Sequence, residues 1–527
     1  MREQERAELH RVIWGMANKL RGSVDGWDFK AYVLGFLFYR YLSEDFVNQI
    51  HKEEHKHNPD FSYPDMTDEE VDEAEDFKSS IVNDKGYFIY PSQLFCNVAK
   101  SIKNSKEAKE TLNETLAEVF KSIEASTFGT PSEDKFKGLF DDVELNSNKL
   151  GGTVLERNKR LEDIIASIST LNLGVNNNSI DAFGDAYEYL MQMYASSAGK
   201  SGGEYYTPQE VSELLAKITI GDRTTINKVY DPAAGSGGLL LQFAKILGGK
   251  NITDGFYGQE INITTYNLCR INMLLHGVPY EKMHIRHGDT LTSPKHDNEK
   301  PFQAIVANPP YSISWEGKDD PILVDDPRYA PAGVLAPKSK ADLAFVMHIL
   351  SYLANDGTAA IVSFPGVLYR SGAEQKIRQY LVDNNYVDAI INLPEDLFFG
   401  TSIATSIIVV KKSRQDDKVL FVDASKECVK VTNSNKLTDE NIESIINIYK
   451  TKEEKDHISR LVGKDEIAEN NYNLSVSTYV EPEDTREKVD IDKLNKEIKC
   501  IVGNVDRLRG EIDKIIEEIE GSEEEDE

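Results

Sequence analysis

The chain has 527 residues, of which 40% are hydrophobic and 28% are charged. These proportions describe a folded globular protein of two or three domains and exclude an intrinsically disordered chain. No apolar run near the N-terminus is long enough for a signal peptide or a membrane span, so we expect a cytoplasmic protein without membrane contact. The four cysteines form no CxxC pair and predict neither a zinc site nor a disulfide framework: Cys96, Cys269, Cys428 and Cys500.

The formal net charge is −29, because 89 Asp and Glu residues outnumber 60 Lys and Arg residues. Proteins that bind nucleic acid normally neutralise its phosphates with Lys and Arg. If this chain acts on DNA, it therefore needs a locally basic surface, a basic partner, or both.

Residues 1–175 are predicted to form an all-α domain. Apolar residues recur at helical spacing from Leu9 to Leu20, and a longer apolar helix is expected over residues 29–50. Residues 51–76 are charged and interrupted by prolines, which predicts a solvated loop. Further helices are expected over residues 106–124, 153–171 and 180–197.

From about residue 205, short apolar strands alternate with amphipathic helices. We expect strands at residues 228–230, 255–258, 284–287, 303–307, 358–364, 387–392, 405–411 and 418–422. Helices are expected after Ser236 and over residues 262–276, 341–353 and 373–383. This alternation predicts an α/β fold with a mainly parallel sheet covered by helices on both faces. Because no helix separates the last three strands, the sheet should end in an antiparallel hairpin.

The chain ends in three segments of different character. Residues 424–485 are polar and read as an irregular connecting region, residues 486–520 as a coiled-coil helix, and residues 521–527 as a solvated acidic tail. The helix carries an unbroken a/d seam that it cannot bury alone, which predicts a helical partner. The seam consists of Ile491, Leu494, Ile498, Ile501, Val505, Leu508, Ile512, Ile515 and Ile519. Gly503 and Gly510 weaken the helix but fall at the outward f position and leave the seam intact.

Three motifs follow the first three strands of the predicted sheet. The first strand runs into Asp231 and a glycine-rich turn, where backbone can approach a ligand at a helix N-terminus. Glu260, after the second strand, suits a ribose diol, and Asp289, after the third, can accept a hydrogen bond from an adenine amino group. The turn consists of Gly235, Ser236, Gly237 and Gly238. Since it is not a full GxGxxG, the motifs favour a nucleoside cofactor over a dinucleotide.

The fourth strand runs directly into Asn308, Pro309, Pro310 and Tyr311. An amino nitrogen conjugated to a ring is a poor nucleophile, because its lone pair is delocalised. The Asn308 side-chain oxygen and the Pro309 carbonyl can accept hydrogen bonds from its two N–H groups and free that lone pair. The Tyr311 ring offers a face on which an extruded base can stack. The motif therefore predicts chemistry at an amino nitrogen.

These motifs resemble those of the N6-adenine DNA methyltransferases with gamma motif order. The resemblance rests on DPAAGSGG at residues 231–238, NPPY at 308–311 and YYTPQ at 205–209. Within that group the chain is most similar to the methylation (M) subunit of type I restriction-modification systems. That similarity also includes residues 9–22, YVLGFLFYRYLSE and a late motif at 392–406, so it covers nearly the whole chain. It implies a class I S-adenosylmethionine-dependent methyltransferase domain over residues 176–423.

The resemblance implies a role for each motif. Residues 236–238 would hold the methionine portion of S-adenosyl-L-methionine, Glu260 its ribose and Asp289 its adenine. An upstream segment would share the methionine portion: Glu204, Tyr205, Tyr206, Thr207, Pro208 and Gln209. Residues 308–311 would bind a flipped adenine, with Phe398 or Phe399 as a second stacking face. Because the sulfonium methyl is already activated, no metal is expected.

The resemblance also implies partners, which fits the acidic composition. A separate specificity (S) subunit would read the target sequence in double-stranded DNA and supply basic surface, bound through the C-terminal coiled coil. A second M subunit and a restriction (R) subunit would complete the assembly. We further expect residues 312–340, rich in Pro and Asp, to form a mobile loop ordered by DNA or a partner.

Three alternatives stay open. A glutamine-N5 methyltransferase faces the same electronic problem at an amide nitrogen, but it needs neither a long helical domain nor a coiled tail. A self-sufficient adenine methyltransferase would need its own target-recognition domain, for which residues 424–527 are too few and too acidic. A non-catalytic assembly subunit would have no need of Asp231, Glu260 and Asn308.

Overall fold

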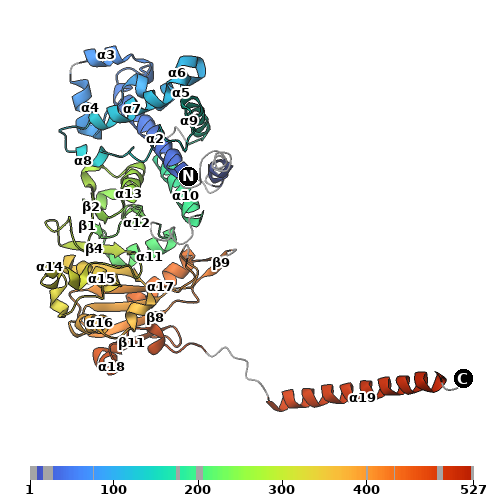
Figure 1. Cartoon of the computed structure of the whole chain (residues 1–527). Coiled ribbons are helices and arrows are strands. Elements are labelled where there is room, and N and C mark those ends of the chain that lie inside the picture. The colour runs from blue at the N-terminus through green and yellow to red at the C-terminus, as the bar shows by residue number, and fades with distance from the viewer. Residues whose placement is uncertain are drawn as a thin grey trace. The chain divides into compact units, whose positions relative to one another are not determined.

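The structure is a computed structural model that describes residues 7, 9–15, 28–74, 76–173, 179–197, 206–398, 401–431, 434–483 and 491–523 (Figure 1). The chain divides into two compact units, Met1–Glu481 and Pro482–Glu527. The first unit contains an α-helical N-terminal region and an α/β region. The second contains one long helix.

The N-terminal region is built around one buried helix, α2 (Asp28–Glu54). Its residues 32–43 are all buried, as expected for a central helix that is apolar nearly all round. The helices that share its core are α3 (Asp68–Glu73), α4 (Phe77–Lys85), α5 (Phe95–Asn104), α6 (Lys106–Glu110), α7 (Leu112–Ala125), α8 (Glu133–Phe136) and α9 (Val154–Ser169). The helices predicted at 29–50, 106–124 and 153–171 are confirmed, the second as a pair that breaks at Thr111.

The prediction of an open loop at residues 51–76 is wrong in part. The segment contains α3, whose N-terminus is closed by a capping box between Thr67 and Glu70. Tyr63 is fully buried, and its hydroxyl donates to Ile89 O at 2.8 Å. The charged composition of the segment concealed these few anchoring contacts.

The α/β region contains a nine-stranded sheet in the order β11-β8-β6-β7-β5-β4-β1-β2-β3 (Figure 1). Paired strands are parallel except that β7 is antiparallel to β5 and β6, and β11 is antiparallel to β8. The strands are β1 (Ile226–Asp231), β2 (Ile252–Glu260), β3 (Met283–His287), β4 (Phe302–Ala307), β5 (Leu353–Ser363), β6 (Val387–Asn392), β7 (Ser406–Lys411), β8 (Lys418–Asp423) and β11 (Ser459–Gly463). The predicted mainly parallel sheet is confirmed.

Helices cover both faces of this sheet. Val229 points into the core that the sheet shares with the N-terminal region, whereas its neighbour Tyr230 points into a second core on the opposite face. The first face carries α11 (Gln209–Ile220), α12 (Gly238–Leu247), α13 (Ile263–Leu275) and α17 (Asp439–Thr451). The second carries α15 (Asp342–Tyr352), α16 (Ala373–Asp383) and α18 (Lys464–Glu469). Helix α10 (Ser179–Ser197) lies against both α2 and α13.

The predicted antiparallel hairpin exists between β6 and β7, but it does not end the sheet. β8 adds to β6 in parallel, and β11 then forms the edge. Residues 424–485, predicted to be irregular, therefore supply an edge strand, α17, α18 and a small hairpin of β9 (Val429–Val431) and β10 (Ser434–Lys436). The prediction was wrong because the polar composition of the region concealed its elements: β11 alternates buried with exposed positions, and α17 buries only one face.

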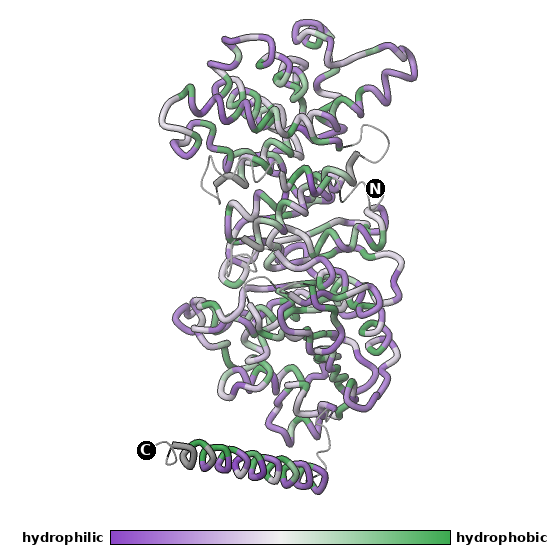
Figure 2. The backbone as a smooth tube through the Cα atoms, turned by 90° about the vertical axis from the view of Figure 1, so that its right-hand side faces the viewer, coloured by the Kyte–Doolittle hydropathy of each residue, from purple (hydrophilic) through white to green (hydrophobic). Residues whose placement is uncertain are grey.

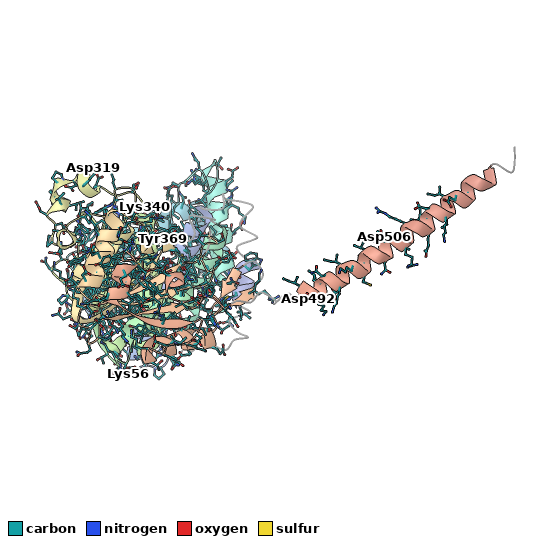
Figure 3. All side chains as sticks on the ribbon, turned by 90° about the horizontal axis from the view of Figure 1, so that it is seen from below. Lys56, Asp319, Lys340, Tyr369, Asp492 and Asp506 are labelled. Carbon is teal, nitrogen blue, oxygen red and sulfur yellow. The ribbon has the colours of Figure 1, made fainter. Side chains whose placement is uncertain are left out.

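Residues 312–340, predicted to be a mobile loop ordered by DNA or a partner, are instead packed against the second core by the chain itself. The segment contains α14 (Pro321–Val324), and Asp319 lies at its outer edge (Figure 3). Three of its aromatic and aliphatic side chains are buried against the second core: Trp315, Leu323 and Tyr329. Arg328, also in this segment, is 4% exposed, and its guanidinium donates to Thr290 O at 2.8 Å and Leu291 O at 2.7 Å. This arginine therefore stabilises the fold.

The second unit consists of α19 (Ile491–Glu523), which confirms the predicted C-terminal helix and extends three residues beyond its predicted end. One side of the helix is apolar and the other is polar (Figure 2), with charged side chains such as Asp492 and Asp506 projecting from it (Figure 3). Val502 and Ile516, at e positions, widen the apolar stripe beyond the a/d seam. In the part of the chain that the structure describes, no helix is long and apolar enough to span a membrane.

Candidate cofactor and target-base site

The turn between β1 and α12 is shaped by glycine. Gly235 and Gly237 have φ angles of 54° and 79°, in the left-handed region that glycine adopts without strain. A Cβ on Gly237 would lie 2.9 Å from Cys269 Sγ, so packing excludes a side chain as well. The Ser236 carbonyl accepts a hydrogen bond from Asn272 Nδ2 at 2.9 Å. These contacts hold the turn as a fixed backbone surface at the start of α12.

Asp231, at the end of β1, is fully buried. Its Oδ1 accepts a hydrogen bond from Ala233 N at 2.9 Å, whereas Oδ2 has no partner among the described residues. Burial, with a smaller contribution from Glu260, raises the pKa of Asp231 to about 8. A buried acceptor of this kind fits a positively charged donor such as an ammonium group.

Glu260, at the end of β2, accepts hydrogen bonds from backbone amides in two turns, the glycine-rich turn and the one that follows β2. Its Oε2 accepts from Gly235 N at 3.0 Å, and its Oε1 accepts from Asn262 N at 2.8 Å. Burial raises the pKa of Glu260 despite these bonds. Each oxygen retains lone-pair capacity for a ribose hydroxyl, so the geometry fits the predicted role. The carboxylate also braces the glycine-rich turn, which the sequence did not indicate.

Asp289 follows β3 and caps the turn after it. Its Oδ1 accepts from Leu291 N at 2.8 Å and its Oδ2 from Thr292 Oγ1 at 2.9 Å. The carboxylate is therefore held in one orientation, with lone pairs left for a further donor.

Asn308, directly after β4, is held from two sides. Its Nδ2 donates to Thr207 Oγ1 at 3.0 Å, and its Oδ1 accepts from the Tyr311 hydroxyl at 2.8 Å. Burial, and to a smaller degree Asp342, raises the pKa of Tyr311, so its hydroxyl stays protonated as a donor. The two contacts orient the amide with its oxygen towards Tyr311.

The candidate residues gather around two cavities. The main cavity, of about 770 Å³, is lined by Glu260, Asp289, Asn308 and Pro310 among the predicted residues. A second, of about 10 Å³, is lined by Tyr206, Thr207, Gln209, Ser236 and Gly238. Asp231, Gly235 and Tyr311 line neither, but each hydrogen bonds to a residue of the main cavity. Pro208, Gly237 and Pro309 are chain neighbours of lining residues, and Glu204 and Tyr205 lie outside the described residues.

One wall of the main cavity comes from the N-terminal region, which sequence reasoning missed. Tyr32 on α2 lines it, and the Tyr32 hydroxyl donates to Glu144 O at 2.8 Å. Asp142, another lining residue, accepts from Thr264 Oγ1 at 2.7 Å and Asn267 Nδ2 at 3.0 Å, both in α13. Tyr32 begins the segment YVLGFLFYRYLSE, which indicated a helix but not a cavity wall, and Asp142 belongs to none of the motifs described above.

One of the two phenylalanines predicted as a second stacking face is buried in the fold. Phe398 is 6% exposed and belongs to the first core, so its ring is not presented to a base in this conformation. Phe399 lies outside the described residues. Ile261, which sequence reasoning missed, is 65% exposed and lines the main cavity next to Glu260.

Comparison with known proteins gives matches across the chain. The family model described as N-6 DNA Methylase matches residues 178–488, and that of the HsdM N-terminal domain matches residues 9–168. The type I restriction enzyme MpnII methylase subunit of Mycoplasma pneumoniae is 50% identical over 530 residues, or 98% of this chain and 97% of that protein. A crystal structure of a type I restriction-modification methyltransferase subunit from Streptococcus thermophilus has a TM-score of 0.80 at 35% identity, covering 90% of this chain and 100% of that one.

A further relative is similar over a shorter part of the chain. The type I restriction enzyme MjaVIII methylase subunit of Methanocaldococcus jannaschii is 32% identical over 394 residues, covering 69% of this chain and 66% of that protein. The chain therefore belongs to the N-6 DNA methylase family, with the class I S-adenosylmethionine-dependent methyltransferase fold. Within that family it is a methylase subunit of a type I restriction-modification enzyme. The predicted resemblance, fold class and enzyme class are confirmed, and the glutamine-N5 alternative is rejected.

Proposed function

We propose that the chain binds S-adenosyl-L-methionine and a flipped adenine of double-stranded DNA in the main cavity and transfers the methyl group to N6. The meeting of Glu260, Asp289 and Asn308 at one cavity of about 770 Å³ carries this proposal. Residues that bind the cofactor and the target base must lie within reach of one another. The volume also lies within the range of about 300–1,000 Å³ that small-molecule sites occupy.

The residues around the cavity suit the parts of the cofactor. Glu260 would accept hydrogen bonds from the ribose hydroxyls, and Asp289 would accept one from the adenine amino group. Residues 236–238 and 204–209 would hold the methionine portion, with Asp231 Oδ2 as the buried acceptor for its ammonium group. When bound, S-adenosylmethionine supplies an activated methyl group. The chain then has to position the two reactants and exclude water.

At the target nitrogen the chain contributes hydrogen-bond acceptors. Asn308 Oδ1 and Pro309 O would accept from the two N–H groups of N6, which draws the nitrogen towards tetrahedral geometry and frees its lone pair. Thr207 already orients the Asn308 amide from its nitrogen side. The Tyr311 hydroxyl would give up or share Oδ1 when the base enters, while its ring stacks on the base.

Sequence recognition belongs to another chain in this proposal. With a net charge of −29, the methylase subunit depends on an S subunit for basic surface and base contacts. The apolar stripe of α19 is the surface for that subunit. Because it includes the e positions Val502 and Ile516, it suits burial against more than one helix. A second M subunit and an R subunit complete the assembly.

Co-purification with the products of the neighbouring reading frames, followed by a methyl-transfer assay, tests the proposal. We expect N6-methyladenine in double-stranded DNA, identified by mass spectrometry of the nucleosides. Methylated cytosine as the product, or no transfer by the assembled complex, would contradict it. Calorimetry of the chain alone with S-adenosylmethionine tests the cofactor site independently of DNA.

A further inference from the structure

We propose that Glu188, on α10, is a positioning residue that holds the two cofactor-facing segments in register with each other and thereby orients the Asn308 amide. The two segments are residues 206–209 and the glycine-rich turn at 235–238. The inference rests on the proposed function of these segments. Glu188 belongs to none of the motifs that the sequence analysis singled out.

Glu188 is a buried anion contacted from three other elements. It is 8% exposed, and its Oε2 accepts a hydrogen bond from Gln209 Nε2 at the start of α11. Lys245 Nζ in α12 lies 2.8 Å from Oε1 and 3.0 Å from Oε2, and His276 Nε2 lies 3.2 Å from Oε1. Burial opposes ionisation, but hydrogen bonding and charge from His276, followed by Lys245, hold the pKa of Glu188 at about 2.

Two series of contacts, here called arms, start at the Glu188 carboxylate. The first arm runs through Gln209 to Asn308. Gln209 is the first residue of α11, and Thr207 lies only two residues before it. Pro208, between them, has a fixed φ angle, so the connection is short and stiff. Thr207 Oγ1 accepts from Asn308 Nδ2 at 3.0 Å. An anchor on Gln209 therefore acts on the amide that is proposed to bind the target nitrogen.

The second arm runs from Glu188 through His276 to the glycine-rich turn. The other ring nitrogen of His276, Nδ1, lies 2.9 Å from Asn272 O, and Asn272 Nδ2 donates to Ser236 O at 2.9 Å. Gly184 on α10 makes room for this contact, because a Cβ there would lie 2.8 Å from His276 Nε2. The same carboxylate thus reaches both segments.

Residues of both arms also lie around one small cavity. Glu188 lines the cavity of about 10 Å³ together with Thr207, Gln209, Ser236 and Gly238. A cavity of this size holds about one water molecule at most, so the two segments pack closely on this side of the carboxylate. On its other side Glu188 lines a cavity of about 470 Å³ together with Lys245 and His276. Removing the carboxylate frees Gln209 and His276 at once, and a shift of about 1 Å in a reacting group can lower a rate by roughly 10²-fold.

Glu188→Ala and Glu188→Gln, compared with Asp185→Ala, test the inference. Asp185 is the matched control, because it lies on the same helix and its carboxylate contacts His10 Nε2 at 2.8 Å, outside both arms. In the assembled enzyme we expect Glu188→Ala to lower kcat for methyl transfer by about 10²-fold. Glu188→Gln keeps an acceptor for Gln209 and should recover about tenfold of that loss. Asp185→Ala should leave kcat within about threefold, even where it lowers the melting temperature as much as Glu188→Ala.

A purely structural role would make kcat follow the melting temperature across the three variants, and that result would overturn the inference. If Glu188→Ala does not fold, Gln209→Leu removes the same hydrogen bond from the other side. Its loss of kcat should not increase when Glu188→Gln is added, and an additive loss would count against the coupling. A wild-type chain that binds no S-adenosylmethionine would overturn the proposed function itself. If the wild type binds the cofactor and is active, and Glu188→Ala binds and turns over equally well, only the positioning role is overturned.

Discussion

The hydroxyl of Tyr311 donates a hydrogen bond to Asn308 Oδ1 at 2.8 Å. The oxygen that is proposed to accept from the target N–H group therefore already accepts a hydrogen bond before the base enters. Thr207 holds the other end of the amide. The acceptor is therefore oriented before the base enters, which is the arrangement that lowers reorganisation during a reaction. We therefore propose two separable functions for Tyr311: its hydroxyl occupies Asn308 Oδ1 until the base enters, and its ring stacks on the base.

Substitutions at these two residues should separate the functions. Asn308→Ala should lower kcat by about 10²–10³-fold, because one oriented hydrogen bond in the transition state is lost. Tyr311→Phe keeps the ring and should cost less than about tenfold, whereas Tyr311→Ala should approach the loss of Asn308→Ala. Single-turnover methyl transfer measures all three. Cofactor affinity, measured by calorimetry, should stay near the wild-type value, and a large loss of affinity in Asn308→Ala would argue against its place at the base.

Glu260 should control cofactor affinity through two kinds of contact. Glu260→Ala removes the proposed ribose acceptor and also the acceptors of Gly235 N and Asn262 N, so binding should fall most in this variant. Glu260→Gln keeps one acceptor oxygen and should bind with intermediate affinity. Calorimetric titration with S-adenosylmethionine gives the order directly. Equal binding by a folded Glu260→Ala chain and the wild type would remove Glu260 from the site.

Cofactor binding should depend on pH through Asp231. Because the pKa of Asp231 is about 8 in the free chain, its carboxyl group is mostly protonated at pH 7. Pairing with a cofactor ammonium group favours the anion, so binding should release a proton and strengthen as pH rises towards 8. Calorimetry in buffers with different ionisation enthalpies measures this release.

Asp231→Asn is the control, because it should bind S-adenosylmethionine more weakly and without the pH dependence.

The raised pKa of Asp231 also determines how the folding stability of the free chain changes with pH. Between about pH 4 and 8 the free folded chain holds a proton that the unfolded chain has released, so Asp231 lowers stability as pH rises through that window. Affinity that falls between pH 6 and 8 would contradict the assignment.

Asp388 should be a main determinant of acid stability. Its buried carboxylate lies 3.0 Å from Lys452 Nζ, 3.1 Å from Lys411 Nζ and 3.2 Å from Arg414 Nε, and it accepts from the Tyr449 hydroxyl at 2.7 Å. Burial opposes ionisation, but Lys452 and Lys411 lead the interactions that hold its pKa at about 2. Asp388→Asn removes the counter-charge that Lys452 and Lys411 share and leaves Arg414 with only the exposed Asp416. It should cost about 3–5 kcal/mol in free energy of unfolding, measured with urea.

The stabilisation that Asp388 contributes should be lost at low pH. Because the pKa is lowered from 3.8, the stabilisation is present above about pH 4 and is lost as pH falls towards 2. Asp388→Asn should therefore flatten the loss of stability in that range. Asp416→Asn is the matched control, since Asp416 pairs with the same Arg414 at 3.0 Å from an exposed position. Equal destabilisation by both variants would show that burial of the charge does not matter.

The stripe of α19 should be required for assembly and not for cofactor binding. Ile501→Lys together with Leu508→Lys places two charges in the seam and should abolish co-purification with the S subunit. Glu517→Lys, at an f position, should assemble normally. Deletion of residues 490–527 should reproduce the seam variant, with loss of sequence-specific methylation but unchanged affinity for S-adenosylmethionine. Normal assembly by the deleted chain would assign the stripe another role.

Local patterns predicted most of the sheet and the residues at its strand ends. The helix expected at residues 373–383 is α16 over the same residues, and the strand expected at 228–230 is the centre of β1. Asp231, Glu260, Asp289 and Asn308 could be predicted as candidates because each ends a strand or follows it within two residues. Strand period, turn residues and motif chemistry all operate within about ten residues, so they are visible without a structure.

Contacts between distant segments could not be predicted in this way. Thr207 and Asn308 are 101 residues apart in the chain, and nothing in either sequence neighbourhood indicates their hydrogen bond. Residues 312–340 looked like a loop because their buried anchors are sparse. The partners that hold Arg328 in the fold include Thr290 O and Leu291 O, 38 and 37 residues away in the chain, which no local pattern indicates. The edge strand β11 escaped detection because it is short and adds to the sheet from outside the predicted hairpin.

The wall that the N-terminal region contributes to the main cavity limits how this chain can be divided. Arg270 in α13 is 2% exposed, and its guanidinium donates to the backbone oxygens of Asp134, Lys135 and Lys137 across the boundary between the regions. A fragment that began at residue 176 would leave this charge without those acceptors and would open one side of the cofactor site. A chimera that exchanged the helical region with that of a relative would therefore have to carry a matching surface on α13.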